Sequence, residues 1–130
     1  MGKKLNEDIA VIEYDNLFYS DDVKAITNGV IVASGQGKLK RGTLLAKNSD
    51  NKMIVLGSDA DDEDVETKAS ADCVLTDDID ASSEDVSAAA YIQGDFNINA
   101  LITAEGYTIS QADKDILRTK NILIGRTLGY

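Results

Sequence analysis

The stretch VIVASGQGKLKRGTLLAK, residues 30–47, has a run of aliphatic residues on either side of a segment rich in glycine and lysine. Each aliphatic run is short and is bounded by turn-forming residues, as is typical of buried β-strands. Three glycines lie within eight residues of the intervening segment, at positions 35, 37 and 42. Glycine adopts backbone conformations that a Cβ disfavours. We therefore expect two strands joined by a bent connection on the protein surface.

The same connection has some of the residues of a phosphate-binding loop. Such a loop follows the pattern G-x-x-x-x-G-K-[ST], in which the lysine reaches the phosphates. Here Gly37, four residues and Gly42 are followed directly by Thr43, so the lysine is missing. A dinucleotide-binding loop would need a third glycine where this chain has Lys40. We expect the segment to turn the chain and to bind no nucleotide.

Further strand pairs are expected before and after this connection. The dipeptide Asn28-Gly29 lies between VKAIT and VIVAS and suits a tight hairpin turn. GTLLAK and KMIVL flank the polar sequence NSDN, which predicts a second pair of strands. ADCVLT and VSAAAYI are short apolar runs consistent with buried strands. The chain has no proline, so glycine, asparagine and aspartate mark its turns.

The C-terminal part of the chain predicts one short helix over about residues 110–120. Ser110 is followed three residues later by Asp113, a capping box with aspartate in place of the usual glutamate. The helix should have one apolar side, formed by Ala112, Ile116 and Leu117. Lys120 and Asn121 suit its C-terminus, and NILIG predicts a last strand.

Composition excludes several classes of function. The net charge is −10, and the small basic run at residues 38–41 is the exception in an acidic chain. Such a surface repels phosphate backbones, so we expect no nucleic acid partner. The longest apolar run, residues 88–92, is too short to cross a membrane, and the first residues lack the apolar block of a signal peptide. We therefore expect neither membrane insertion nor secretion.

The sequence offers little for catalysis or metal binding. It has no histidine, so serine and cysteine triads of the usual kind cannot form. The only cysteine, Cys73, lies in an apolar run and reads as a buried thiol, with a nucleophile as the alternative. The acidic run at residues 58–66 fails the EF-hand pattern, because Asp64 stands at the glycine position and Ser70 at the glutamate position. We expect no metal, no cofactor and no enzyme activity, although a pocket with facing carboxylates among residues 77–85 would indicate a hydrolase.

The N-terminal residues 1–15 are interpreted as an extended, flexible arm ahead of one domain at residues 16–130. The arm is charged at first and then reads IAVIEY, with apolar residues on both faces of an extended strand. An apolar strand of this kind can add to the exposed edge of another protein's sheet. The residues expected to bind are Leu5, Ile9, Val11, Ile12 and Tyr14. Tyr14 clusters with Phe18 and Tyr19, which serve either a protein contact or core packing.

Several segments, taken in order, resemble the head decoration proteins of tailed bacteriophages, the group typified by the lambda capsid-stabilising protein. These segments are LKRGTLL, DIDAS and GDFNINAL, the last with Gly94, Phe96, Asn97, Asn99 and Leu101 in the expected places. The resemblance covers roughly residues 16–125. The chain departs from the family in the linker DADDEDVETKAS, where the family has an Asp-Gly followed by small polar residues.

The resemblance implies a mainly β fold of the β-clip kind with little helix and no enzymatic activity. It further implies a homotrimer that binds the major capsid protein at local threefold positions on the outer surface of the virion. The protein would be made in the cytoplasm of the host bacterium. In the family the N-terminal segment becomes ordered against the major capsid protein, and residues 1–15 are expected to do so here. The alternative is a β-rich adaptor or binding module of a phage tail or baseplate.

Overall fold

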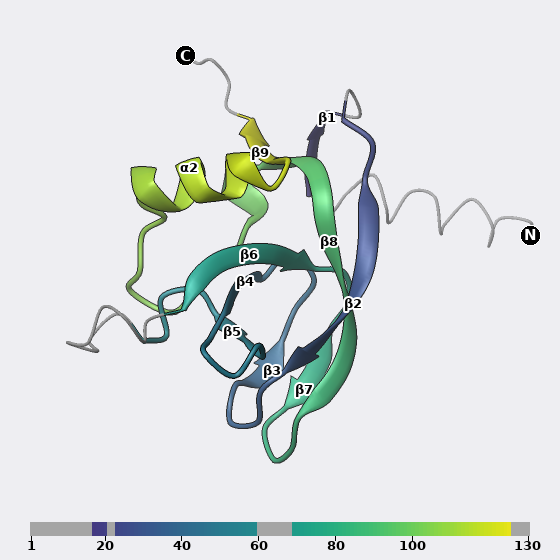
Figure 1. Cartoon of the computed structure of the whole chain (residues 1–130), viewed down its shortest axis with the longest axis vertical. Helices are drawn as coiled ribbons and strands as arrows, with labels where there is room; N and C mark the ends of the chain where they lie inside the picture. The colour runs from purple at the N-terminus through teal and green to yellow at the C-terminus, as the bar shows by residue number, and fades with distance from the viewer. Residues whose placement is uncertain (1–16, 21–22, 60–68, 126–130) are drawn as a thin grey trace, which may run out of the picture.

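A computed structural model describes residues 17–20, 23–59 and 69–125 of the chain (Figure 1). The predicted fold class is confirmed, because the protein is mainly β with one short C-terminal helix. No helix among the described residues is long and apolar enough to cross a membrane. The elements are, in order, β1 (Phe18–Ser20), β2 (Ile26–Val32), β3 (Gly37–Leu39), β4 (Leu44–Lys47), β5 (Met53–Val55), β6 (Ser70–Leu75), β7 (Ile79–Ala81), β8 (Val86–Asn97), the 3-10 helix η1 (Ile98–Ala100), α2 (Gln111–Thr119) and β9 (Ile122–Gly125).

Strand β8 organises the main sheet, because it pairs with four other strands. Its residues from Val86 to Gln93 run antiparallel to β2, and Tyr91 pairs with β2 on one side and with β6 on the other. Its last four residues pair with β1 and with the parallel strand β9. The order β8, β2, β5, β4, β6 returns to β8, so these five strands close the sheet on itself. Closure of this kind leaves few free strand edges.

The core lies inside the closed sheet and under α2. Strands β4 and β6 supply seven of the eighteen buried apolar residues in the described part of the chain, and their apolar residues are buried on both faces. Phe96 is the largest fully buried side chain and comes from the end of β8. Cys73 is completely buried, as predicted, and burial raises the pKa of its thiol. The largest fully buried side chains are those of Phe96, Leu44, Leu45, Leu75, Leu117, Ile122, Val32, Val74, Thr43 and Cys73.

The glycine-rich connection turns the chain, as the sequence predicts. Gly35, Gly37 and Gly42 have positive φ angles of 85°, 84° and 95°. Gly42 lies between two other segments, because its amide donates to the Leu75 carbonyl and its carbonyl accepts from the Ile102 amide. The connection also contains β3, which pairs with β7 in a separate two-stranded sheet and was not predicted. The backbone groups at Gly42 are therefore used for strand contacts and not for a phosphate.

The predicted hairpin at Asn28-Gly29 is wrong. Both residues lie in the middle of β2, and each residue of that strand has a partner on β8. Asn28 pairs with Ala90 and Gly29 with Ala89. A run of antiparallel pairs along the whole strand outweighs the local preference of one dipeptide for a turn. The second predicted pair is confirmed, since β4 and β5 are antiparallel across the 48–52 turn.

The predicted helix and last strand are confirmed as α2 and β9. Ser110 is the N-cap of α2, and its hydroxyl and the Asp113 side chain form both hydrogen bonds of the capping box. One detail of the prediction is wrong, because Ala112 is exposed while Leu117 is fully buried. Only the end of the helix near Leu117 is pressed against β6 and β9 (Figure 1). A residue in its first turn therefore stays in water.

Candidate protein-binding edge

The arm residues Leu5, Ile9, Val11, Ile12 and Tyr14 lie outside the described residues. The described chain begins at Leu17, which is only 2% exposed. The Leu17 carbonyl accepts a hydrogen bond of 2.8 Å from the amide of Asn97, at the end of β8. The segment that precedes residue 17 is therefore attached to the body at a buried, hydrogen-bonded position.

Phe18 packs within the body, which resolves one of the two alternatives left by the sequence. Its ring stacks on Phe96 at a centroid distance of 5.1 Å and meets the edge of Tyr91 at the same distance. The Arg41 guanidinium lies 5.5 Å from the centre of the Tyr91 ring and donates to the Tyr91 hydroxyl at 2.8 Å. The neighbouring Tyr19 differs, because 45% of it is exposed. Phe18 thus serves packing, and Tyr19 remains available for a protein contact.

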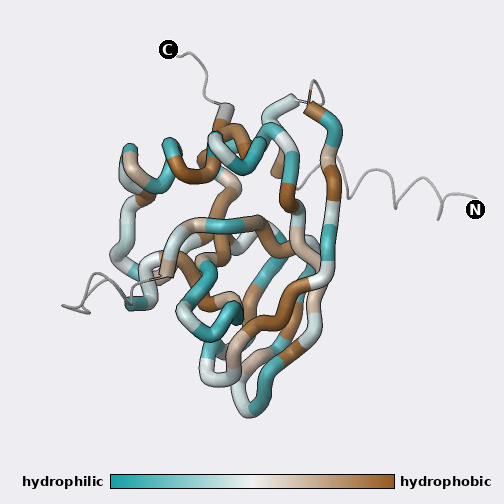
Figure 2. Tube along the Cα trace, viewed as in Figure 1, coloured by the Kyte–Doolittle hydropathy of each residue, from teal (hydrophilic) through white to brown (hydrophobic). Residues whose placement is uncertain are grey.

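The outer edge of β2 carries exposed apolar residues. We call residues 26–31 of this strand, on the side away from β8, the β2 edge. Ile26 and Ile31 are 41% and 40% exposed. Together with Tyr19 on β1 they make three of the four large apolar side chains that are exposed in the described part of the chain, the fourth being Ile102. Figure 2 shows hydrophobic stretches toward the two ends of β2, with a more hydrophilic stretch between them.

A hollow lies between β1 and β2 beside this edge. Its volume is about 550 Å³, and the residues that line it are Phe18, Ser20, Val23, Lys24 and Ala25. Its lining is mostly apolar, so it can accept an apolar side chain of a partner. The sequence reasoning missed Ile26, Ile31 and this hollow. A signal was present, because residues 23–33 contain no acid in a chain with 23 acidic residues.

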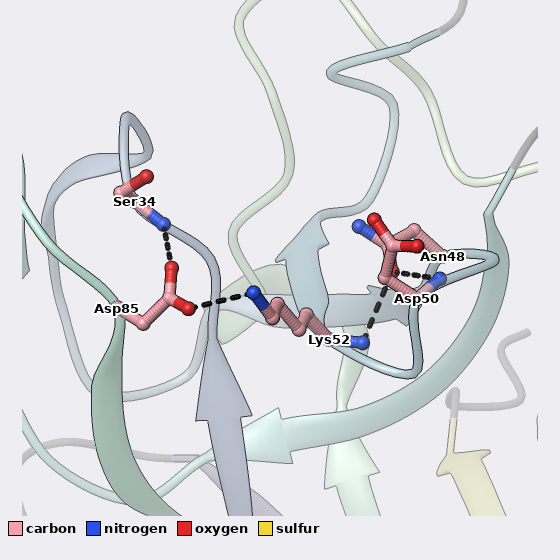
Figure 3. Close-up of polar contacts among 5 residues, drawn as sticks. All are labelled: Ser34, Asn48, Asp50, Lys52 and Asp85. Carbon is pink, nitrogen blue, oxygen red and sulfur yellow. Dashed lines mark hydrogen bonds and ion pairs between the residues drawn. The ribbon is translucent and has the colours of Figure 1, made fainter.

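Two of the acidic residues at positions 77–85, Asp80 and Asp85, are held by hydrogen bonds to neighbouring loop residues. Asp85 accepts from the Ser34 amide at 2.9 Å and from Lys52 Nζ at 2.7 Å (Figure 3). These hydrogen bonds hold the pKa of the Asp85 carboxyl below its ordinary value of 3.8. Asp80 accepts from the amide and hydroxyl of Ser82, which lower its pKa in the same way. Both carboxylates are exposed and bind loop residues, so neither has the raised pKa of a general acid.

Metal binding finds no support in the parts of the chain that the structure describes. No group of three or more cysteine or acidic residues there is arranged to hold an ion. Most of the acidic run, residues 60–68, lies outside the description. Asp59, at its start, accepts a hydrogen bond from the amide of Ala69, which follows the run.

A second, larger groove lies on a different part of the surface. It has a volume of about 880 Å³ and is bordered by the lysines of β3 and its flank, Lys38 and Lys40. Its apolar lining includes Leu39, Ile54 and Ile102, and Asp59 and Glu105 also border it. The rim of this groove therefore carries both positive and negative side chains.

The chain matches a known protein family over most of its length. The model of the family described as bacteriophage lambda head decoration protein D matches residues 8–124 of this 130-residue chain. The match covers strands β1 to β8, the helix α2 and β9 as far as Ile124, and it begins within residues 1–15. Comparison with curated proteins finds no matching relative.

Proposed function

The chain belongs to the family of the bacteriophage lambda head decoration protein D, and from this premise we propose that it is a trimeric cement protein of the expanded capsid. The trimer would bind the outer surface of the head at local threefold positions and stabilise the shell against the pressure of the packaged DNA. The family match over residues 8–124 is the observation that carries this proposal. The protein would be made in the host cytoplasm, have no cofactor and catalyse no reaction.

We further propose that residues 1–15 are the arm that grips the major capsid protein, and that residues 16–130 form the single domain that carries it. Four of the five arm residues, Ile9, Val11, Ile12 and Tyr14, fall inside the region that matches the family, and Leu5 precedes it. An apolar strand gains main-chain hydrogen bonds when it adds to a sheet edge, and it loses conformational entropy as it becomes ordered. The arm therefore binds weakly by itself.

Three arms on one trimer compensate for the weakness of each. Once one arm is bound, the other two are held near their sites at a high effective concentration. A protein that binds only the expanded shell stabilises that shell by mass action. At a free concentration of a hundred times Kd, the gain is about 2.7 kcal/mol per site. Summed over many sites, this gain opposes rupture of the shell.

The charge of the chain is consistent with an outward-facing position. A net charge of −10 keeps such a protein soluble. It also prevents binding to nucleic acid, including DNA released from damaged heads. The partners proposed are therefore the major capsid protein and two further copies of this chain.

Co-sedimentation with expanded, undecorated heads tests the proposal. We expect the full-length protein to bind saturably and a variant that begins at Asn16 to bind at least about tenfold more weakly. A variant with Ile9→Asp and Val11→Asp should behave like the truncated protein, whereas the matched control with Glu7→Ala and Glu13→Ala should bind like the wild type. Binding by all four proteins with equal affinity would remove the arm from the mechanism.

The oligomeric state is a separate test. Sedimentation equilibrium of the purified protein should give a mass three times the 13.9 kDa of the chain. A protein that stays monomeric at micromolar and higher concentrations and does not bind expanded heads would refute the cement role. Electron microscopy of decorated heads then shows whether the bound protein follows local threefold axes.

A further inference from the structure

We propose that the β2 edge is a second docking site on this protein, which accepts an extended segment of the major capsid protein as an additional strand. This inference rests on the proposed capsid role and adds to it a surface of the folded body. It concerns residues 26–31 and their neighbours, and it does not involve the arm residues as the binding group.

The backbone of the β2 edge is open to a partner strand. On its inner side β2 pairs with β8 at every residue from Ile26 to Val32. On its outer side the described part of the chain supplies a partner only at Val32, which pairs with Met53 of β5. Among the residues that the structure describes, no other strand covers the edge before Val32, and five of the six residues 26–31 are exposed. Such an edge is a template for a strand of another chain.

The side chains of the β2 edge do not protect it against such pairing. Exposed edges are usually blocked by lysine, other charges or proline. Strand β2 has the sequence ITNGVIV and contains none of these. Gly29, in the middle of this strand, has no side chain that could hinder a partner strand. The edge is exposed and uncharged, which are the properties of a strand edge that another chain can cover.

Apolar contacts are available on either side of the incoming strand. Thr27, Gly29 and Ile31 share one face of β2, and Asn28 and Val30 share the other. Ile31 is 40% exposed and offers a contact at one end, and Ile26 offers another at 41%. The hollow of about 550 Å³ between β1 and β2 can take a side chain of the partner near Ile26. Main-chain hydrogen bonds would supply affinity, and these apolar contacts would supply specificity.

A capsid segment fits this edge better than a second copy of the chain. Two copies that pair through the same edge make a twofold contact, whereas a threefold assembly needs two different complementary patches. The position of the arm also favours the capsid protein. The arm joins the body at Leu17, and only residues 21–25 separate β1 from β2. The point where the arm joins the body and the β2 edge therefore lie on neighbouring segments of the chain.

Substitution of lysine for residues of the β2 edge tests whether a capsid strand binds there. The variant Thr27→Lys with Ile31→Lys places two charges on one face of β2, where both side chains are exposed, and should block strand addition. The controls are Thr27→Val, which keeps the strand propensity, and Ser83→Lys, which adds a charge on an exposed loop away from the edge. Circular dichroism and thermal melts establish that each variant is folded.

Binding to expanded, undecorated heads is measured for each protein, both at full length and beginning at Asn16. We expect the double lysine variant to bind at least about tenfold more weakly than wild type in both lengths, and the controls to stay within about twofold. Hydrogen exchange should show slower exchange of amides in residues 26–32 when the wild type is bound. Normal binding by the lysine variant, or unchanged exchange, overturns the docking site and leaves the cement role intact.

Two other outcomes are also informative. If wild type itself fails to bind heads, the proposed function fails, and the docking site fails with it. The β2 edge could instead be a contact between copies of this chain. In that case the lysine variant would change the mass of the free protein in sedimentation, and the amides of residues 26–32 in the wild type would be protected from exchange before heads are added. That result overturns the assignment to the capsid protein.

Discussion

The ring of Tyr107 lies directly against the backbone of Gly57. A Cβ added at Gly57 would come within 2.3 Å of Tyr107 Cγ, and Gly57 has a positive φ of 94°. The Tyr107 hydroxyl donates to the carboxylate of Asp113 at the start of α2. This contact therefore links the turn after β5 to the N-terminus of the helix.

Gly57→Ala should lower the free energy of unfolding by about 3 kcal/mol, because it adds both a left-handed backbone strain and a clash with the ring. Gly106→Ala is the matched control, since Gly106 also has a positive φ, of 81°, but an added Cβ there meets nothing within 4 Å. It should cost about 1 kcal/mol. Equal losses in urea denaturation would show that Tyr107 does not pack on Gly57.

Arg41→Lys should destabilise the protein by about 1–2 kcal/mol. The Arg41 guanidinium donates to the Thr76 carbonyl and to the Tyr91 hydroxyl, and it lies over the Phe18 and Tyr91 rings. A lysine ammonium keeps the charge but lacks the planar fork that makes these contacts together. Lys40→Arg, at the exposed neighbouring position, should leave the denaturation midpoint nearly unchanged. A loss of similar size in both variants would assign the effect to general surface charge.

Ser110→Ala should lower stability by about 1 kcal/mol, because it removes the cap of α2. The Ser110 hydroxyl accepts from the Asp113 amide at 3.0 Å, and the Asp113 carboxylate accepts from the Ser110 amide at 3.0 Å. Ser110→Thr retains the hydroxyl and should recover most of the loss. The measurement is urea denaturation followed by circular dichroism, and an alanine variant as stable as the wild type would contradict the capping role.

The stability that Asp85 contributes should depend on pH. Its pKa is held below the ordinary value of 3.8, first by the hydrogen bond from Lys52 and then by the bond from the Ser34 amide. A carboxyl whose pKa is lower in the folded state stabilises the fold above its unfolded pKa, and this stabilisation is lost as pH falls through the folded value. Asp85→Asn should therefore lower Tm near neutral pH and have no effect well below 3.8. The same Tm difference at both extremes would show that the ionised form is not involved.

The Cys73 thiol should resist modification while the protein is folded. It is fully buried, and burial raises its pKa, so the reactive thiolate is scarce. A thiol reagent at pH 8 should label Cys73 rapidly in denaturant. In native buffer, labelling should be slow, at a rate limited by unfolding of the protein. Asp72→Asn is an informative companion, because the Asp72 charge is the second cause of the raised pKa. Rapid labelling of the native wild type would contradict the buried position.

The sequence predicted correctly those features that depend on residues close together in the chain. The capping box at Ser110 and Asp113 located the start of α2, because both hydrogen bonds join residues three apart. The glycines at 35, 37 and 42 predicted a bent connection, because a positive φ is a property of the residue itself. The buried Cys73 followed from the apolar run around it. In each case the responsible interactions lie within a few residues of one another.

Long-range pairing accounts for the errors. Asn28-Gly29 favours a turn locally, but β2 pairs with β8, a strand more than fifty residues later in the chain, along its full length. Ala112 fits the apolar side of a helix, yet only the end of α2 near Leu117 reaches the core. The residue pattern of β2 or α2 does not predict which other strand or helix will pack against that element. The same limitation hid the β2 edge, whose exposure depends on where the parallel strand β5 begins.

The amino-acid sequence alone determined that this protein is mainly β, where its helix begins, where its backbone needs glycine and which family it resembles. These properties arise from side-chain size, local hydrogen bonding and the order of short segments along the chain. Only the tertiary structure decided that β8 pairs with four strands and that β2 keeps one edge open. Strand partners are selected by the packing of residues far apart in the chain, so the exposed edge exists only once the sheet has closed.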